Sequence, residues 1–224
     1  MEAEKGSVMN MEAEVIYIDE KEIDFNKYMD APPEAEKVIP ASQYQTQLID
    51  AFHAGQVDPG CYLPWHKTHG QVKMRPGEFT LWPGINAHGK SMVINLIMLS
   101  IMAQSERVCI ASFEMKPRRT MQRMVRQFSG VMVPTISEIK KFSNWLIDRL
   151  WIYDQLGSVK ADRLLAVIRY CFAELDIHHF VIDSLMMCGI GTDDYNKQKW
   201  FAAELSGIAR DYNKNIHLDC KFTF

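Results

Sequence analysis

The chain has 224 residues, 47% of them hydrophobic, which is enough for one domain with a sizeable core or for two small ones. The net charge is −3, but residues 1–40 carry eleven acidic side chains against four lysines, so the remainder has a basic excess. The five cysteines include no C-x-x-C pair, which argues against a zinc site or a disulfide framework and fits a reducing cytoplasm. The acidic start does not resemble a secretory signal, and the most apolar run, 92–103, is too short to span a bilayer.

Residues 1–75 precede the most informative motif. Residues 1–40 have little periodicity, and their acidity is typical of a flexible tail, although 15–18 could form a short strand. Residues 41–75 are expected to be a linker, with a short amphipathic helix over 43–54 and then a loop. That helix could cover a sheet edge or dock on a neighbouring subunit, and the sequence alone does not decide between the two.

The stretch 79–91 reads F-T-L-W-P-G-I-N-A-H-G-K-S and contains G-x-x-x-x-G-K-S between an apolar run and a long apolar segment. This pattern predicts the strand, tight loop and helix of a phosphate-binding P-loop. Backbone N–H groups of such a loop point at the phosphates of ATP, the lysine reaches the β- and γ-phosphates, and the serine hydroxyl is a Mg²⁺ ligand. The predicted nucleotide-binding residues are Gly84, Asn86, Ala87, His88, Gly89, Lys90 and Ser91.

The next apolar run, 107–113, looks like a buried parallel strand, and Glu114 stands at its carboxyl end. Ligand chemistry gathers at that end in open α/β sheets. The residues alone leave two interpretations open: a general base that orients the attacking water, or an ordinary glutamate before a helix beginning at Pro117. The helix from 117 to 127 carries four arginines, which form either a solvated face or a binding surface.

A second informative stretch is H-F-V-I-D at 179–183, an apolar strand that ends in an aspartate. Downstream of a P-loop this is the Walker B pattern, so Asp183 is predicted to hold Mg²⁺. His178 and His179 should point to opposite faces of the strand, and we interpret them as structural. The remaining predicted elements are helices over 135–150, 160–175 and 196–212 and strands at 151–154 and 216–218.

Four segments together resemble one family, the ring-shaped replicative DNA helicases of the DnaB type, nearest to phage primase-helicases and the mitochondrial helicase Twinkle. The resemblance covers roughly residues 43–218 and rests on M-R-P-G-E-F-T-L-W-P-G-I-N-A-H-G-K-S at 74–91, R-V-C-I-A-S-F-E-M-K at 107–116, H-F-V-I-D-S-L at 179–185 and D-D-Y-N-K-Q-K at 193–199.

The resemblance implies an α/β fold, a RecA-like P-loop NTPase domain over 76–224 with a mostly parallel sheet flanked by helices. It also implies a homo-oligomeric ring, usually a hexamer, that hydrolyses ATP with Mg²⁺ and moves 5′ to 3′ on single-stranded DNA in a bacterial or phage-infected cytoplasm. The glutamate of S-F-E-M activates water in this family, which favours a catalytic role for Glu114 together with Lys90. Lys197 and Lys199 follow a loop that faces the central channel, so they either neutralise DNA phosphates or are ordinary surface lysines.

Two departures from the family pattern affect this interpretation. Residues 1–40 hold no zinc motif and leave no room for a primase domain, so priming is not expected. After 216–218 the chain reads Asp-Cys-Lys-Phe-Thr-Phe, where relatives continue with a polar sensor, DNA-binding loops and an arginine finger. We therefore expect a truncated domain, with its sheet incomplete at the C-terminal end and its hydrolysis weakened or lost.

Two alternative functions stay open. A RecA-family ATPase of recombination or regulation would pair or bind strands without progressive unwinding. A remnant without turnover would bind nucleotide and release no phosphate.

Overall fold

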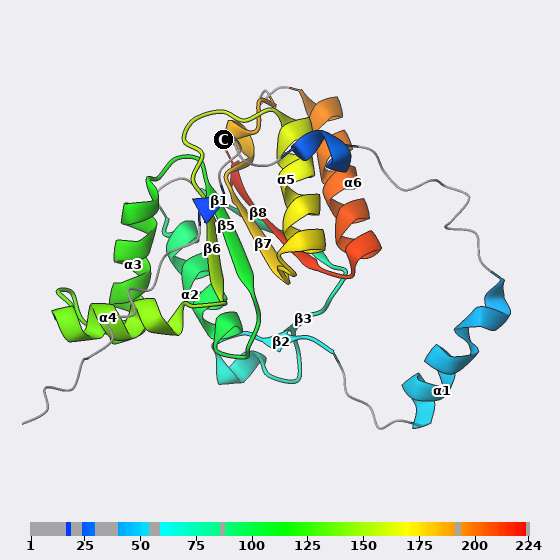
Figure 1. Cartoon of the computed structure of the whole chain (residues 1–224), viewed down its shortest axis with the longest axis horizontal. Coiled ribbons are helices and arrows are strands. Elements are labelled where there is room, and N and C mark those ends of the chain that lie inside the picture. Colours follow the sequence, from blue (N-terminus) through cyan, green and yellow to red (C-terminus); the bar gives the residue numbers. More distant parts are fainter. Residues whose placement is uncertain are drawn as a thin grey trace, which may run out of the picture.

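The computed structural model describes residues 17–18, 24–29, 40–53, 59–85, 88–190 and 194–222. Its centre is a six-stranded sheet of order β1-β6-β5-β7-β8-β4, in which every neighbouring pair is parallel (Figure 1). The predicted α/β class, with a parallel sheet flanked by helices, is confirmed. The strands are β1 Tyr17–Ile18, β4 Phe79–Ile85, β5 Val108–Ser112, β6 Leu150–Tyr153, β7 His179–Asp183 and β8 Asn215–Phe222.

Helices cover both faces of this sheet (Figure 1). One face carries α2 (Lys90–Met102), α3 (Pro117–Ser129) and α4 (Ile136–Trp145), and the other carries α5 (Ala161–Glu174) and α6 (Tyr195–Tyr212). Side chains alternate along a strand, so Val108 and Ile110 of β5 join the core under α2, whereas Cys109 and Ala111 join the core under α5. Because both faces are buried, the central strands are apolar along their whole length.

Strand β8 corrects the expectation that this strand is cut short, and it leaves β4 as the edge strand of the sheet. It runs from Asn215 to Phe222 and lies between β7 and β4, with its last four residues in register with Trp82 to Ile85. The polar residues Asp219 and Lys221 suggested that the strand ends at residue 218. The pairing with β4 is made by backbone groups, so it does not depend on these side chains. The position between β7 and the edge strand β4 is therefore filled.

Part of the stretch expected to be a tail contacts the core. The 3-10 turn η1 (Phe25–Tyr28) lies against α5, with Tyr28 buried and its hydroxyl donating to Glu174 Oε1 at 2.6 Å. Arg169 Nη1 donates to the Tyr28 carbonyl at 3.1 Å. Of the predicted short strand at 15–18, residues 17–18 are described and form β1; apart from 24–29 and Pro40, the other residues of the predicted tail lie outside the described part.

The linker region contains a separate helix and a small hairpin. Helix α1 (Gln45–His53) follows the turn η3 (Ala41–Tyr44) and stands apart from the sheet in Figure 1, with Leu48, Ile49 and Phe52 exposed. It therefore does not cover a sheet edge of its own chain. The region predicted as a loop contains the antiparallel pair β2 (Cys61–Tyr62) and β3 (Lys73–Met74), joined through the turn η4 (His66–Thr68).

Candidate active site

The carboxyl ends of β4, β5, β7 and β8 meet at one edge of the sheet, where the predicted site residues gather. Strand β4 ends at Ile85 and α2 begins at Lys90, so the predicted strand, loop and helix are all present. Gly89 caps α2 with φ +81°, a conformation that favours glycine. A Cβ at Gly84 would lie 2.8 Å from Lys90 Cδ, so a side chain there would require the lysine side chain to shift.

The structure describes some of the other predicted loop residues. Asn86 and Ala87 lie outside the described residues. His88 is exposed, and Ser91 is half-buried in the first turn of α2. The N-terminus of α2 offers backbone N–H groups and the positive end of the helix dipole, which together suit an anion.

Lys90 is folded back onto the strand that precedes it. Its Nζ donates to the Gly84 carbonyl at 2.9 Å and to the Ile85 carbonyl at 3.3 Å, and it lies 3.6 Å from Asp219 Oδ1. Asp219 is 2% exposed and stands opposite Trp82 in the pairing of β8 with β4. Asp219 was not among the predicted site residues, because the strand was expected to cover only 216–218.

Glu114 and Asp183 come from adjacent strands. The Ser184 hydroxyl, fully buried just after β7, donates to Glu114 Oε1 at 2.9 Å. The Ser112 hydroxyl donates to Asp183 Oδ2 at 3.3 Å, and these two residues are register partners in the β5–β7 ladder. The fold thus brings together both predicted carboxylates, and it adds Ser184 as the group that holds Glu114.

The donor atoms of these groups determine which ligands the site suits. The Ser91 hydroxyl and the Asp183 carboxylate are hard oxygen ligands of the kind Mg²⁺ prefers. Burial raises the pKa of the nearby Cys220 thiol to about 11, so the thiol is neutral and a poor nucleophile. The arrangement offers a lysine, a helix N-terminus, two carboxylates and no reactive cysteine thiolate, a set that suits phosphoryl transfer to water.

The two lysines predicted to contact DNA lie in the first turns of α6 and are exposed. Asp194 caps this helix by accepting from the Lys197 backbone N–H at 3.1 Å, and the Lys197 Nζ lies 3.0 Å from Asp194 Oδ2. Lys197 is therefore already next to a carboxylate, which makes Lys199 the better placed of the two for a phosphate.

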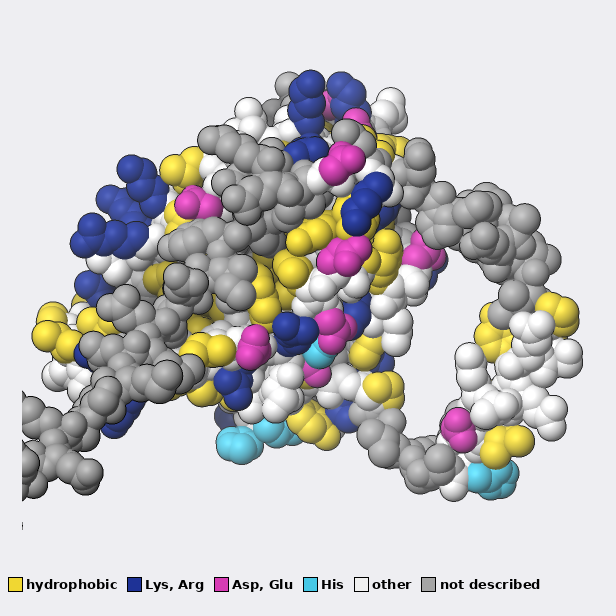
Figure 2. Space-filling view, viewed as in Figure 1, with side chains coloured by type: hydrophobic (Ala, Val, Ile, Leu, Met, Phe, Trp, Pro, Cys, Tyr) yellow, Lys and Arg dark blue, Asp and Glu magenta, His cyan; other side chains and the backbone are white. Residues whose placement is uncertain are grey.

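A larger basic surface lies on α3. Its four arginines are all exposed, and Figure 2 shows the dark-blue basic side chains gathered over this helix. They are Arg118, Arg119, Arg123 and Arg126.

Comparison of the sequence with protein-family models and with curated proteins finds no match. Among the described residues, no helix combines the length and apolar character needed to span a bilayer.

Proposed function

We propose that this chain is a P-loop ATPase with a RecA-like domain, and that it drives movement on single-stranded DNA as the motor of a replicative helicase. The observation that carries the proposal is the loop between β4 and α2, where Lys90 lies against Gly84 and Ile85 at the edge that also holds Glu114 and Asp183. A chance G-x-x-x-x-G-K-S match has no reason to lie at that edge.

Binding would begin at the loop. The Lys90 ammonium would leave the Gly84 and Ile85 carbonyls and Asp219 to meet the β- and γ-phosphates, while N–H groups at the start of α2 donate to phosphate oxygens. The Ser91 hydroxyl and Asp183 would hold Mg²⁺, which neutralises charge that develops on the phosphates.

Hydrolysis would depend on Glu114. Its carboxylate would orient a water molecule for attack on the γ-phosphate and accept a proton from it. The hydrogen bond from Ser184 fixes how this carboxylate is presented. Glu114 is exposed, so its hydrogen bond to the buried Ser184 would favour one orientation of the carboxylate.

Action on DNA and assembly into a hexameric ring rest on the sequence resemblance. The basic excess after residue 40, the exposed Lys199 and the arginines of α3 supply charge for an anionic partner. The exposed apolar face of α1 supplies a surface that a second copy of the chain would cover.

The test compares wild-type protein with Lys90→Ala, Glu114→Gln and the control Asp162→Asn, an exposed aspartate of α5. We expect Lys90→Ala to lose binding of a fluorescent ATP analogue, and Glu114→Gln to bind it normally but release phosphate roughly 10³-fold more slowly. The control should match wild type, and single-stranded DNA should stimulate phosphate release.

The outcomes separate the alternatives. Unchanged hydrolysis in Glu114→Gln would refute the assigned base. Nucleotide binding with no phosphate release by wild type, even with DNA, would indicate a non-hydrolysing protein. DNA-stimulated hydrolysis without unwinding of a forked duplex would indicate a recombination or regulatory ATPase.

A further inference from the structure

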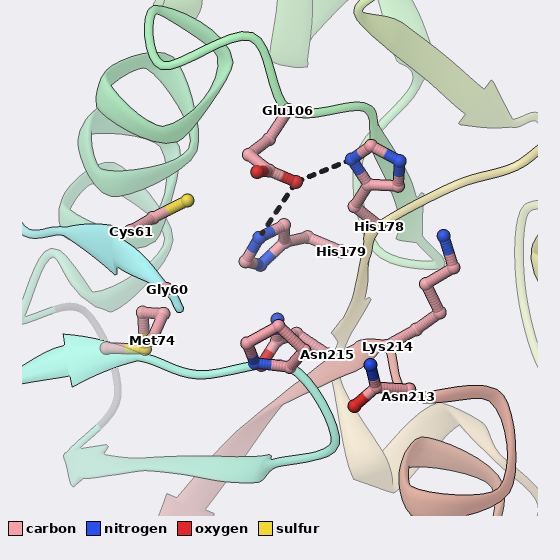
Figure 3. A pocket seen from close by; sticks show the side chains of 10 residues that line it. Gly60, Cys61, Met74, Glu106, His178, His179, Asn213, Lys214 and Asn215 are labelled. Carbon is pink, nitrogen blue, oxygen red and sulfur yellow. Dashed lines mark ion pairs between the residues drawn. The ribbon is translucent and has the colours of Figure 1, made fainter. Parts of the chain in front are cut away.

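The amino-terminal edge of the sheet, opposite the edge described above, contains a hollow of about 210 Å³. It is formed where the β2–β3 hairpin meets the turn before β5 and the first residues of β7 and β8 (Figure 3). Polar side chains line it although most of the surrounding strand residues are apolar. No part of the nucleotide site uses these residues.

Three side chains with metal-binding atoms converge here. The Cys61 Sγ, a Glu106 carboxylate oxygen and a ring nitrogen of His179 all lie within 4.8 Å of one another. Cys61 and His179 are 5% and 1% exposed, while Glu106 is half-buried. They come from the hairpin, from a turn and from β7, so only the fold brings them together.

Glu106 is held between two imidazoles (Figure 3). Its Oε2 lies 2.5 Å from His178 Nδ1 and 3.9 Å from His179 Nε2. The expectation that the two histidines point to opposite faces is therefore wrong: His178 precedes β7, so strand alternation does not apply to it, and both rings reach Glu106. The hydrogen bond with His178 keeps the pKa of Glu106 low, so this residue is an anion at neutral pH.

Two further residues complete the surroundings. The Nδ1 of His179 lies 3.0 Å from His217 Nε2. When a histidine binds a metal through one ring nitrogen, its other ring nitrogen usually has a hydrogen-bond partner of this kind. Asn215 lines the same hollow and is 3% exposed, and its buried Oδ1 has no hydrogen-bond partner. A buried amide oxygen without a partner is costly, so this atom calls for a bound water or ligand in the hollow.

We propose that Cys61, Glu106 and His179 form a binding site for Zn²⁺, with water or the Asn215 Oδ1 as fourth ligand. Thiolate, imidazole and carboxylate together suit Zn²⁺ better than Mg²⁺ or Ca²⁺. Metal–ligand bonds of about 2.0–2.3 Å place tetrahedral ligands roughly 3.3–3.8 Å apart, so the widest separation would have to close by about 1 Å.

The site would tie the hairpin before β4 to the edge of the sheet. The hairpin has four strand residues, and its side chains Cys61, Leu63 and Met74 pack in the core under α2. A metal bound to β2, to the turn before β5 and to β7 would fix it against the sheet. Its role would be structural, and the site is separate from the proposed nucleotide site.

Binding would also change the hydrogen bonds behind His179. The Trp82 indole N–H donates to His217 Nδ1 at 3.4 Å, so His217 carries its proton on Nε2 and donates it to His179 Nδ1. A metal on His179 Nε2 requires the proton on Nδ1 instead. The neutral His217 would then carry its proton on Nδ1, facing the Trp82 N–H, and the bond between them would be lost.

The experiment uses the full chain, stripped with a chelator and titrated with Co²⁺ as a spectroscopic substitute for Zn²⁺. We expect one equivalent of Co²⁺ with a thiolate-to-cobalt charge-transfer band, displaced by Zn²⁺, in wild type and in the control Cys220→Ser. The band should be absent in Cys61→Ser, and Co²⁺ affinity should fall at least tenfold in Glu106→Gln and in His179→Asn. Circular dichroism identifies which variants remain folded.

Other outcomes would overturn the proposal. The proposal fails if wild type binds less than one equivalent of Co²⁺ tightly. It also fails if the charge-transfer band persists in folded Cys61→Ser or is lost in Cys220→Ser. Should Cys61→Ser fail to fold, Glu106→Gln decides: unchanged affinity and an unchanged band in that variant would refute the site. The indole N–H resonance of Trp82, assigned with Trp82→Phe, should shift on Zn²⁺ addition, and a fixed resonance would refute the predicted tautomer change.

Discussion

The Lys90 ammonium lies 3.6 Å from the Asp219 carboxylate, joining the first residue of α2 to a buried position on β8. Under the proposed function, a nucleotide has to compete with this carboxylate for Lys90, and the carboxylate also repels the phosphates. The pair thus links β8, the neighbour of the edge strand β4, directly to phosphate binding.

Removing this negative charge should strengthen nucleotide binding. We expect Asp219→Asn, which keeps the shape of the side chain, to bind ADP roughly tenfold more tightly, equivalent to about 1.4 kcal/mol. Calorimetric titration measures the change, with Asp162→Asn on the surface of α5 as the control. Weaker binding in Asp219→Asn would show instead that the carboxylate assists the nucleotide.

Ser184 should act through Glu114. The Ser184 hydroxyl donates to Glu114 Oε1 at 2.9 Å, and Ser184→Ala removes this bond but leaves every proposed phosphate contact in place. Loss of one hydrogen bond to a charged group, about 1.4 kcal/mol, should lower kcat for ATP roughly tenfold with little change in KM. Ser129→Ala, which removes a hydroxyl from α3, is the matched control. An unchanged kcat would mean that Ser184 does not position the base.

The turn η1 should stabilise the domain although it lies far from it in sequence. Tyr28 is buried against α5 and makes an edge-on contact with the Tyr170 ring. Tyr28→Ala should therefore lower the free energy of unfolding by about 2–4 kcal/mol, and Tyr28→Phe by about 1 kcal/mol for the lost hydrogen bond to Glu174. Tyr44→Ala, at an exposed position before α1, should change it by less than about 0.5 kcal/mol. Urea denaturation gives all three values, and equal effects of Tyr28→Ala and Tyr44→Ala would show that η1 does not pack on the core.

Acid should destabilise the protein through a buried histidine. Burial lowers the pKa of His217 from 6.5 to about 4, so above pH 6.5 neither folded nor unfolded chains carry its charge. Between pH 6.5 and 4 the unfolded chain binds the proton and the folded chain does not, so stability falls with falling pH, by about 3 kcal/mol in total.

The measurement is denaturation at several pH values with a chelator present. His217→Gln cannot titrate and should lose stability less steeply over this range, whereas His53→Gln on the exposed surface of α1 should behave as wild type. Equal slopes for wild type and His217→Gln would contradict the assignment.

The apolar face of α1 should support self-association if the proposed ring forms. Phe52 is 78% exposed, and Leu48 and Ile49 beside it are about half exposed. The change Phe52→Ser should reduce the assembled fraction severalfold in sedimentation with ATP, because less apolar surface is removed from water. Gln47→Ser on the same helix is the control, and identical sedimentation of both variants would exclude α1 from the contact.

Local patterns in the sequence determined much of the fold. Apolar runs bounded by charge located β5 and β7, because a strand buried on both faces needs an unbroken apolar run. Helical periodicity located α5 within one residue at each end, and the glycine and lysine spacing located the β4–α2 loop. Those signals lie within a few residues of one another, so no long-range information was needed.

Only the tertiary structure decided what depends on residues distant in sequence. The expected helix over 135–150 divides into α4 and the start of β6, because Leu150 pairs with Val108. Strand β8 continues through Asp219 because β4 pairs with it there, and this places the carboxylate beside Lys90. Cysteine spacing alone argued against zinc, yet Cys61, Glu106 and His179 converge. Backbone pairing and packing fix these contacts, and neither is encoded in the spacing of the residues along the chain.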